Sequence, residues 1–159
     1  MTYLVRTIDH ELDELLPLAA AIAIDGLKGV GKTATAQRRA RHSWFLDNPE
    51  QRRIVEADFD LSSAPEGTLL IDEWQHLPQV WDSVRRGVDR GAPPGRFLLT
   101  GSATPASSSG THSGGGRILS LRMRPIALYE RGQASPTVSV EGLLNGTQGA
   151  ISGTSELTL

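Results

Sequence analysis

The chain has 159 residues, of which 38% are hydrophobic and 21% charged, as in a globular domain with one proper core. Its formal net charge of −2 provides no overall basic field, so nucleic acid is not indicated as a partner. The absence of cysteine excludes a disulfide framework and thiolate metal sites. No run approaches the ~18 apolar residues of a membrane span, and the acidic N-terminus is no targeting sequence, so we expect a cytoplasmic protein.

The first half of the chain predicts short elements around a glycine-rich loop. Residues 8–16 have the spacing of an amphipathic helix, and residues 20–25 form an apolar run of strand length. A helix is expected from Thr33 to about Ser43, with Arg38, Arg39 and Arg41 on a solvated face. Residues 47–52 are interpreted as a loop, and residues 53–57 as a short second strand.

The second half predicts two buried strands separated by a helix. Residues 68–72 are continuously aliphatic until Asp72, a helix runs from near Pro78 to Gly91, and residues 96–100 form the next strand. A low-complexity loop, residues 101–116, precedes an alternating strand at 118–123. After Glu130 the only candidate element is residues 140–144.

Alternating strands and helices predict an α/β fold with a mostly parallel sheet. In such sheets, ligands bind beyond the carboxyl ends of the strands. Three polar clusters follow strand ends in this chain, namely the glycine-rich loop, Asp72-Glu73 and Thr100-Gly101-Ser102. We therefore expect them to converge on one edge of the sheet.

The glycine-rich loop has the spacing G-x-x-x-x-G-K-T from Gly26 to Thr33, which is a phosphate-binding P-loop. Glycines let the backbone curl so that its N–H groups point at phosphate oxygens. Lys32 is expected to reach the β- and γ-phosphates, and the Thr33 hydroxyl to ligate Mg²⁺. The strand before the loop and the helix after it supply the context that this motif requires.

Asp72 and Glu73 follow a strand, where P-loop enzymes place a carboxylate behind the magnesium ion. Glu73 is then a candidate general base for the water that attacks the γ-phosphate. The competing interpretation is that Glu73 only caps the following turn.

Two residues lie at the ends of the low-complexity loop, since Ser102 is its second residue and Arg117 directly follows it. Ser102 is interpreted either as a hydrogen-bond donor to the γ-phosphate or the lytic water, or as half of a turn-forming Gly-Ser pair. Arg117 is interpreted either as an arginine finger, in cis or across a subunit interface, or as the partner of a nearby acid. His112, alone within the loop, is interpreted as a solvated side chain.

These motifs resemble the prokaryotic AAA-type ATP-binding proteins, which join an N-terminal AAA domain to a poorly characterised C-terminal domain. The matching stretches are residues 25–33, 70–75, 98–102, 112–117 and 123–130. The resemblance implies a P-loop NTPase three-layer sandwich of the AAA/ASCE type. It also implies ATP and Mg²⁺ as ligands, and it makes residues 1–130 the ATPase domain. Residues 131–159 would then be a linker, or the start of a second domain that this short chain does not complete.

The resemblance further implies a role for each site residue. It makes the P-loop a Walker A motif that binds nucleotide through Gly26, Leu27, Lys28, Gly29, Val30, Gly31, Lys32, Thr33 and Ala34. Thr33 and Asp72 become the metal-associated pair, with Asp72-Glu73 as Walker B. Lys32, Glu73, Ser102 and Arg117 become the catalytic groups, with Ser102 at a sensor-like position.

The leading hypothesis is an ATPase, weak in this short form, that couples hydrolysis to movement or regulation of a partner domain or protein, with self-association as a further possibility. The alternatives are a nucleotide-binding switch with little hydrolysis, a small-molecule kinase and a non-functional remnant. A loop rich in serine and glycine supplies no arginine lid for a kinase substrate, and a glutamate after the strand's aspartate favours water as the acceptor.

Overall fold

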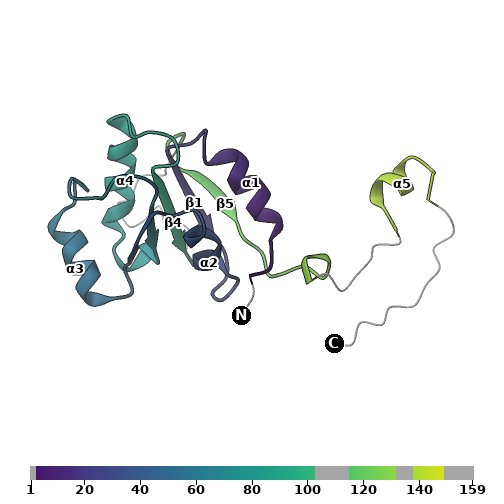
Figure 1. Ribbon diagram of the computed structural model, residues 1–159, viewed down its shortest axis with the longest axis horizontal. Coiled ribbons are helices and arrows are strands. Elements are labelled where there is room, and N and C mark those ends of the chain that lie inside the picture. The colour runs from purple at the N-terminus through teal and green to yellow at the C-terminus, as the bar shows by residue number, and fades with distance from the viewer. Residues whose placement is uncertain (1–2, 103–114, 132–137, 149–159) are drawn as a thin grey trace. The chain divides into compact units, whose positions relative to one another are not determined.

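A parallel five-stranded sheet forms the centre of residues 8–125 (Figure 1). The computed structural model describes residues 3–102, 115–131 and 138–148. By its internal contacts the chain divides into this sheet unit and a terminal unit made of residues 1–7 and 126–159. No helix in the described ranges is long and apolar enough to cross a membrane.

The strand order in the sheet is β2-β3-β4-β1-β5, and every neighbouring pair is parallel. The strands are β1 (Ala21–Asp25), β2 (His42–Phe45), β3 (Leu69–Asp72), β4 (Phe97–Gly101) and β5 (Leu119–Arg122). In the register of β1, Asp25 lies opposite Gly101 of β4 and Arg122 of β5. The carboxyl ends of β1, β4 and β5 are therefore level with one another.

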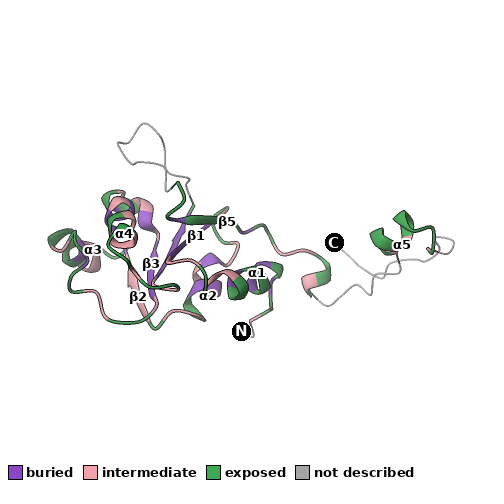
Figure 2. Ribbon diagram, turned by 90° about the horizontal axis from the view of Figure 1, so that it is seen from above, coloured by how far each residue is buried: buried purple, intermediate pink, exposed green. Residues whose placement is uncertain are grey.

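Helices cover both faces of the sheet, because successive strand side chains point to opposite sides. One face packs against α1 (Thr7–Leu15) and α2 (Lys32–Gln37), and the other against α3 (Pro49–Ala57) and α4 (Gln79–Asp89). Leu70 lies in the first of these cores and Ile71 in the second, and β3 and β4 are buried throughout, as is β1 from Ala21 to Ile24 (Figure 2). The three-layer α/β fold that the sequence predicted is confirmed.

Helix α2, which follows the P-loop, is shorter than predicted, and the strand after it, β2, was not predicted. α2 ends at Gln37, and the chain then enters β2 at His42. The N–H groups of Arg41 and His42 both donate to the carbonyl of Thr68, at 2.8 and 3.2 Å, which starts the pairing with β3. Pairing with the free edge of β3 outweighs the local helical preference of residues 38–43.

The predicted strand at 53–57 is wrong, and so is the predicted loop from residue 49 to residue 52, since residues 49–57 form helix α3, and only residues 47–48 of that loop lie outside it. Asn48 caps this helix, because its side-chain oxygen accepts from the N–H groups of Glu50 and Gln51. Pro49 occupies the first helical turn, where its fixed φ is favourable. Val55 is buried on the inner side of α3, whereas its neighbour Ile54 is 65% exposed. This difference is typical of a helix that packs on one side only.

Arg39 does not lie on a solvated face, since it joins α2 to α1. Its guanidinium binds Asp9 at 2.7 Å and Asp13 at 2.5 Å, and its side chain is 11% exposed. The hydrogen bond from Arg39 lowers the pKa of Asp13. The prediction of a solvated face was wrong because the sequence around Arg39 does not show that α1, which carries Asp9 and Asp13, packs nearby.

The terminal unit contains a short 3₁₀ turn, Tyr129–Arg131, and helix α5 (Val140–Leu144). The carboxylate of Glu130 accepts from the N–H of Thr7 at 2.6 Å and of Ala127 at 2.7 Å, and it pairs with Arg6 at 3.2 Å. Burial alone would raise the pKa of Glu130, but these contacts outweigh it and lower that pKa to about 2. Glu130 therefore joins residues 6–7 to residues 127–130.

Candidate functional site

The polar clusters that follow the strands meet at the carboxyl edge of the sheet, as predicted. The P-loop follows β1, Glu73 follows β3, and Ser102 follows β4. Beyond these, the end of β5 brings Arg122 to the same edge, opposite Asp25. His112 and residues 103–114 of the predicted loop lie outside the described residues.

The P-loop backbone depends on its glycines. Gly26, Gly29 and Gly31 have φ of 150°, 84° and 104°, values that side chains with a Cβ rarely adopt. Gly26 also lies against the end of β5, since a Cβ there would be 2.2 Å from the Met123 carbonyl oxygen. The loop shape thus depends on glycine twice, once for its turns and once for its close packing on β5.

Lys32 points back into the loop. Its Nζ donates to the carbonyl oxygens of Gly26 and Leu27, both at 2.9 Å, and the residue is 4% exposed. Of the other predicted loop residues, Leu27, Lys28 and Ala34 are exposed, and Val30 packs against the core on the α2 side. A nearly buried ammonium enclosed by a curled backbone is suited to an anionic ligand.

Thr33 and Asp72 meet between the loop and β3. The Thr33 hydroxyl donates to Asp72 Oδ1 at 2.8 Å, and the Thr100 hydroxyl bonds the same oxygen. Burial raises the pKa of Asp72, and the hydrogen bonds from Thr100 and Thr33 oppose that shift, while the charges of Glu73 and Asp47 add to it.

This pair fits a magnesium ion better than a softer metal. No group of three or more His, Cys, Asp or Glu side chains that could hold a metal occurs among the described residues. One hydroxyl and one carboxylate are oxygen ligands, and Mg²⁺ is commonly held by one or two carboxylates together with substrate phosphates. The donor set therefore matches a magnesium ion brought in with a phosphate ligand.

Glu73 has a left-handed backbone, with φ 53° and ψ 46°, directly after β3. A non-glycine residue in this region costs about 1–3 kcal/mol and persists only where its surroundings enforce it. Its carboxylate makes no capping hydrogen bond to the 3₁₀ turn Trp74–His76 that follows. Instead it accepts from the side-chain amide of Gln75. The interpretation of Glu73 as a simple turn cap is thus not what the structure shows.

Gln75 also reaches the other candidate residue at this edge, Ser102. Its Nε2 lies 3.2 Å from Ser102 Oγ, so one amide bridges the ends of β3 and β4. Sequence reasoning missed this residue, although it lies two positions after Glu73 within a stretch that matches the resembled family. A glutamine carries no charge and no characteristic spacing, so only its contacts reveal it.

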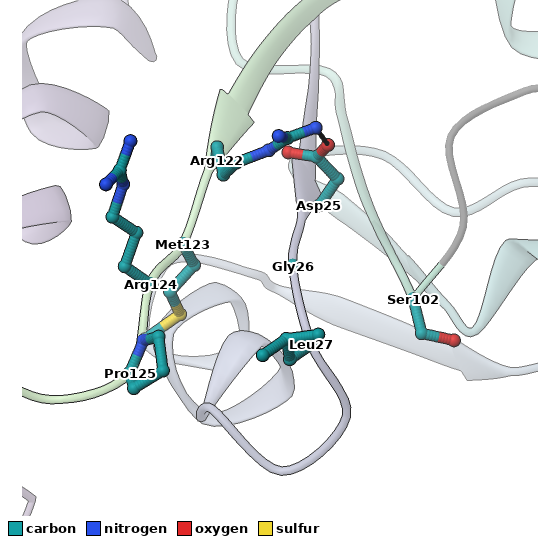
Figure 3. Close-up of a pocket in the computed structure, with 8 residues that line it drawn as sticks. All are labelled: Asp25, Gly26, Leu27, Ser102, Arg122, Met123, Arg124 and Pro125. Carbon is teal, nitrogen blue, oxygen red and sulfur yellow. Dashed lines mark hydrogen bonds and ion pairs between the residues drawn. The ribbon is translucent and has the colours of Figure 1, made fainter.

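A pocket of about 420 Å³ opens beside the start of the P-loop (Figure 3). Asp25, Gly26 and Leu27 line it from β1 and the loop, Ser102 from β4, and residues 122–125 from the end of β5. In Figure 3 the Arg122 side chain extends from β5 to Asp25, to which its Nη2 donates at 3.1 Å. The sequence predicted a strand at 118–123 but did not connect Arg122 or Arg124 with the site.

Arg117 is not brought to this edge. It precedes β5, whose first residue, Leu119, lies opposite Ile22, whereas Arg122 is level with the P-loop strand end. Arg117 lies two residues before β5 begins, and so at the end of that strand away from the P-loop. Arg117 binds Asp89 at the end of α4 instead, and both side chains are half exposed. Pairing with a nearby acid, the alternative interpretation of Arg117, is therefore what the structure shows.

Comparisons with known proteins agree with the geometry. Residues 19–131 match the family model described as an AAA domain. The chain is also similar to the uncharacterized proteins Mb2031c of Mycobacterium bovis and Rv2008c of Mycobacterium tuberculosis. Each is 31% identical over 105 residues, which cover 63% of this chain and 24% of the relative. The matched segment spans about a quarter of the length of these relatives.

Proposed function

Because this chain belongs to the AAA domain family, which implies nucleotide binding, we propose that it binds ATP with Mg²⁺ and hydrolyses the γ-phosphate. The observation that carries the proposal is the 2.8 Å contact between the Thr33 hydroxyl and the Asp72 carboxylate, beside the nearly buried Lys32. A cation ligand pair and a fixed ammonium next to one glycine-rich loop are what a metal–triphosphate needs.

In this proposal, residues 26–34 surround the phosphates. Lys32 exchanges its contacts with the carbonyl oxygens of Gly26 and Leu27 for contacts with phosphate oxygens. Its burial strengthens that interaction, because water screens charges less at a nearly enclosed position.

Thr33 and Asp72 hold the metal side of the site. Mg²⁺, when bound, neutralises charge on the β- and γ-phosphate oxygens. The Thr33 oxygen would be the metal ligand, and Asp72, which accepts from that hydroxyl, would orient it, while the Thr100 hydroxyl holds the Asp72 carboxylate. Asp72 must be ionised for this role, although burial favours its protonated form.

Glu73 acts as the general base. Its carboxylate accepts a proton from a water molecule, whose oxygen forms a bond to the γ-phosphorus while the bond to the β–γ bridging oxygen breaks. The products are ADP and inorganic phosphate. The Glu73 carboxylate accepts from the side-chain amide of Gln75, which also donates to Ser102 Oγ.

We further propose that residues 1–130 form the ATPase domain and that residues 131–159 lead to a partner domain or protein. Support comes from the much greater length of the curated relatives, of which this chain matches 24%. Self-association, cytoplasmic location and a role in regulating that partner belong to the same proposal.

Nucleotide binding is tested by calorimetric titration with a non-hydrolysable ATP analogue and Mg²⁺. Lys32→Ala should weaken the affinity by about tenfold to a hundredfold, because a hydrogen bond to a charged group contributes about 1.5–3 kcal/mol. Arg38→Ala is the control, since Arg38 is an exposed cation that directly follows α2 and lies outside the phosphate-binding loop. Equal affinity of the folded Lys32→Ala protein and wild type would refute the site.

Hydrolysis is tested by phosphate release with water as the only acceptor. Glu73→Gln should keep the affinity and lose about 10²–10⁴-fold in turnover, the usual contribution of a general base. Glu66→Gln is the control, because Glu66 is exposed and lies on the loop before β3. If the wild-type protein binds ATP tightly but does not hydrolyse it, the chain is a nucleotide switch. If turnover requires an added hydroxyl acceptor, the chain is a kinase.

A further inference from the structure

We propose that Gln75 is a positioning residue, whose side-chain amide holds the Glu73 carboxylate and the Ser102 hydroxyl in one hydrogen-bonded chain across the ends of β3 and β4. This inference rests on the proposed hydrolysis at the same site. It assigns a role to a residue to which the sequence analysis gave none.

The amide of Gln75 uses its donors in both directions. Nε2 donates to Glu73 Oε2 and, at 3.2 Å, to Ser102 Oγ. A glutamine amide has two N–H groups, so these two contacts occupy both of them. Gln75 is therefore committed to the site and is not shared with the surrounding structure.

The orientation of the amide follows from its neighbours. Rotating it by half a turn would place the amide oxygen against the Glu73 carboxylate, with one acceptor facing another. In the observed orientation, Gln75 Oε1 is buried and accepts no hydrogen bond from the described residues. Burying an acceptor without a partner costs free energy. The two donor contacts offset that cost, so we infer that they hold the side chain in this orientation.

Gly101 makes room for this arrangement. A Cβ at Gly101 would lie 2.7 Å from Gln75 Oε1 and 2.5 Å from Trp74 Nε1. The end of β4 is thus open at the point where Gln75 passes on its way to Ser102. A side chain at position 101 would displace the amide from the bridge.

The bridge gives each end a defined chemical role. One carboxylate oxygen of Glu73 is held by the amide, so the other is left to accept the proton of a water molecule. Ser102 Oγ accepts from Gln75, so its own hydrogen remains available to donate toward a γ-phosphate or that water. Gln75 therefore orients a proton acceptor and a donor on neighbouring strands without touching the substrate.

The test uses steady-state kinetics of the full chain with ATP and Mg²⁺. Gln75→Met keeps the side-chain length but removes both donors. We expect kcat to fall about tenfold or more while KM and the affinity for an ATP analogue change less than about twofold. Gln79→Met is the matched control, because Gln79 is exposed at the start of α4.

A double-variant cycle separates positioning from simple stabilisation. If Gln75 acts through Ser102, then Gln75→Met combined with Ser102→Ala should turn over no more slowly than the worse single variant. Gly101→Ala should reproduce the loss in kcat. If Gln75→Met does not fold, Ser102→Ala and Gly101→Ala test the same bridge from β4.

The outcomes distinguish the two proposals. Wild-type turnover that Glu73→Gln abolishes, together with an unchanged kcat for Gln75→Met, would overturn the positioning role alone. Additive losses in the cycle would do the same. Absence of turnover in wild type would overturn the proposed hydrolysis, and the role of Gln75 with it.

Discussion

Replacing the first glycine of the P-loop tests how the site is built. In Gly26→Ala, the added Cβ would lie 2.2 Å from the Met123 carbonyl oxygen, which is backbone and cannot rotate away. The neighbouring Met123 N–H donates to the Asp25 carbonyl at 2.7 Å, so moving β5 aside also strains that ladder. The substitution should therefore separate the loop from β5.

The magnitude follows from two terms. Forcing an extra methyl group into a packed position typically costs about 1–3 kcal/mol. A φ of 150° adds backbone strain of about 1–3 kcal/mol for any residue with a Cβ. We expect Gly26→Ala to lower the free energy of unfolding by about 3 kcal/mol or more.

Gly29→Ala is the matched control within the same loop. Its φ of 84° brings backbone strain, but a Cβ there has nothing within 4 Å. We expect a loss of only about 1–2 kcal/mol. Urea unfolding without nucleotide measures both, followed by the fluorescence of Trp74 and Trp81, which lie in the core. Equal losses in the two variants would refute the claim that packing against β5 decides the loop's position.

Three further predictions concern residues outside the loop. Arg39→Met removes the guanidinium that binds Asp9, a residue that is only 4% exposed. The free energy of unfolding, measured with urea, should fall by about 3–5 kcal/mol, and a loss under about 1 kcal/mol would contradict this prediction. Because the pKa of Glu130 is lowered to about 2, its stabilising contribution is present above its ordinary value of 4.5 and is lost as pH falls toward 2. The amide proton shift of Thr7, which donates to that carboxylate, should titrate near the lower value in NMR spectra, and a midpoint near 4.5 would refute the contact. Arg117→Ala should leave single-chain turnover within about threefold of wild type, whereas a loss near 10³-fold that depends on protein concentration would indicate a finger supplied by a neighbouring copy.

The parts of the fold that the sequence predicted correctly carry strong local signals. β3 and β4 each begin with three consecutive apolar residues, and buried parallel strands need such runs because helices cover both faces. The P-loop was equally clear, because its glycine spacing is a local motif. The positive φ angles at these positions explain why glycine occurs there. Helix α3 was missed although Asn48 and Pro49 mark its start, so that error came from overlooking a cap and not from a missing signal.

The sequence by itself determined the fold class, the loop and the edge of the sheet on which polar groups gather, because these follow from local periodicity and the parallel alternation of elements. Only the tertiary structure decided which side chains meet at that edge. Gln75 contacts both Glu73 and Ser102 at this edge. Arg117 lies away from it, because Arg117 precedes the amino end of β5 and the site is at the carboxyl end. Strand register and side-chain contact depend on residues distant along the chain, and no pattern within a single segment encodes them.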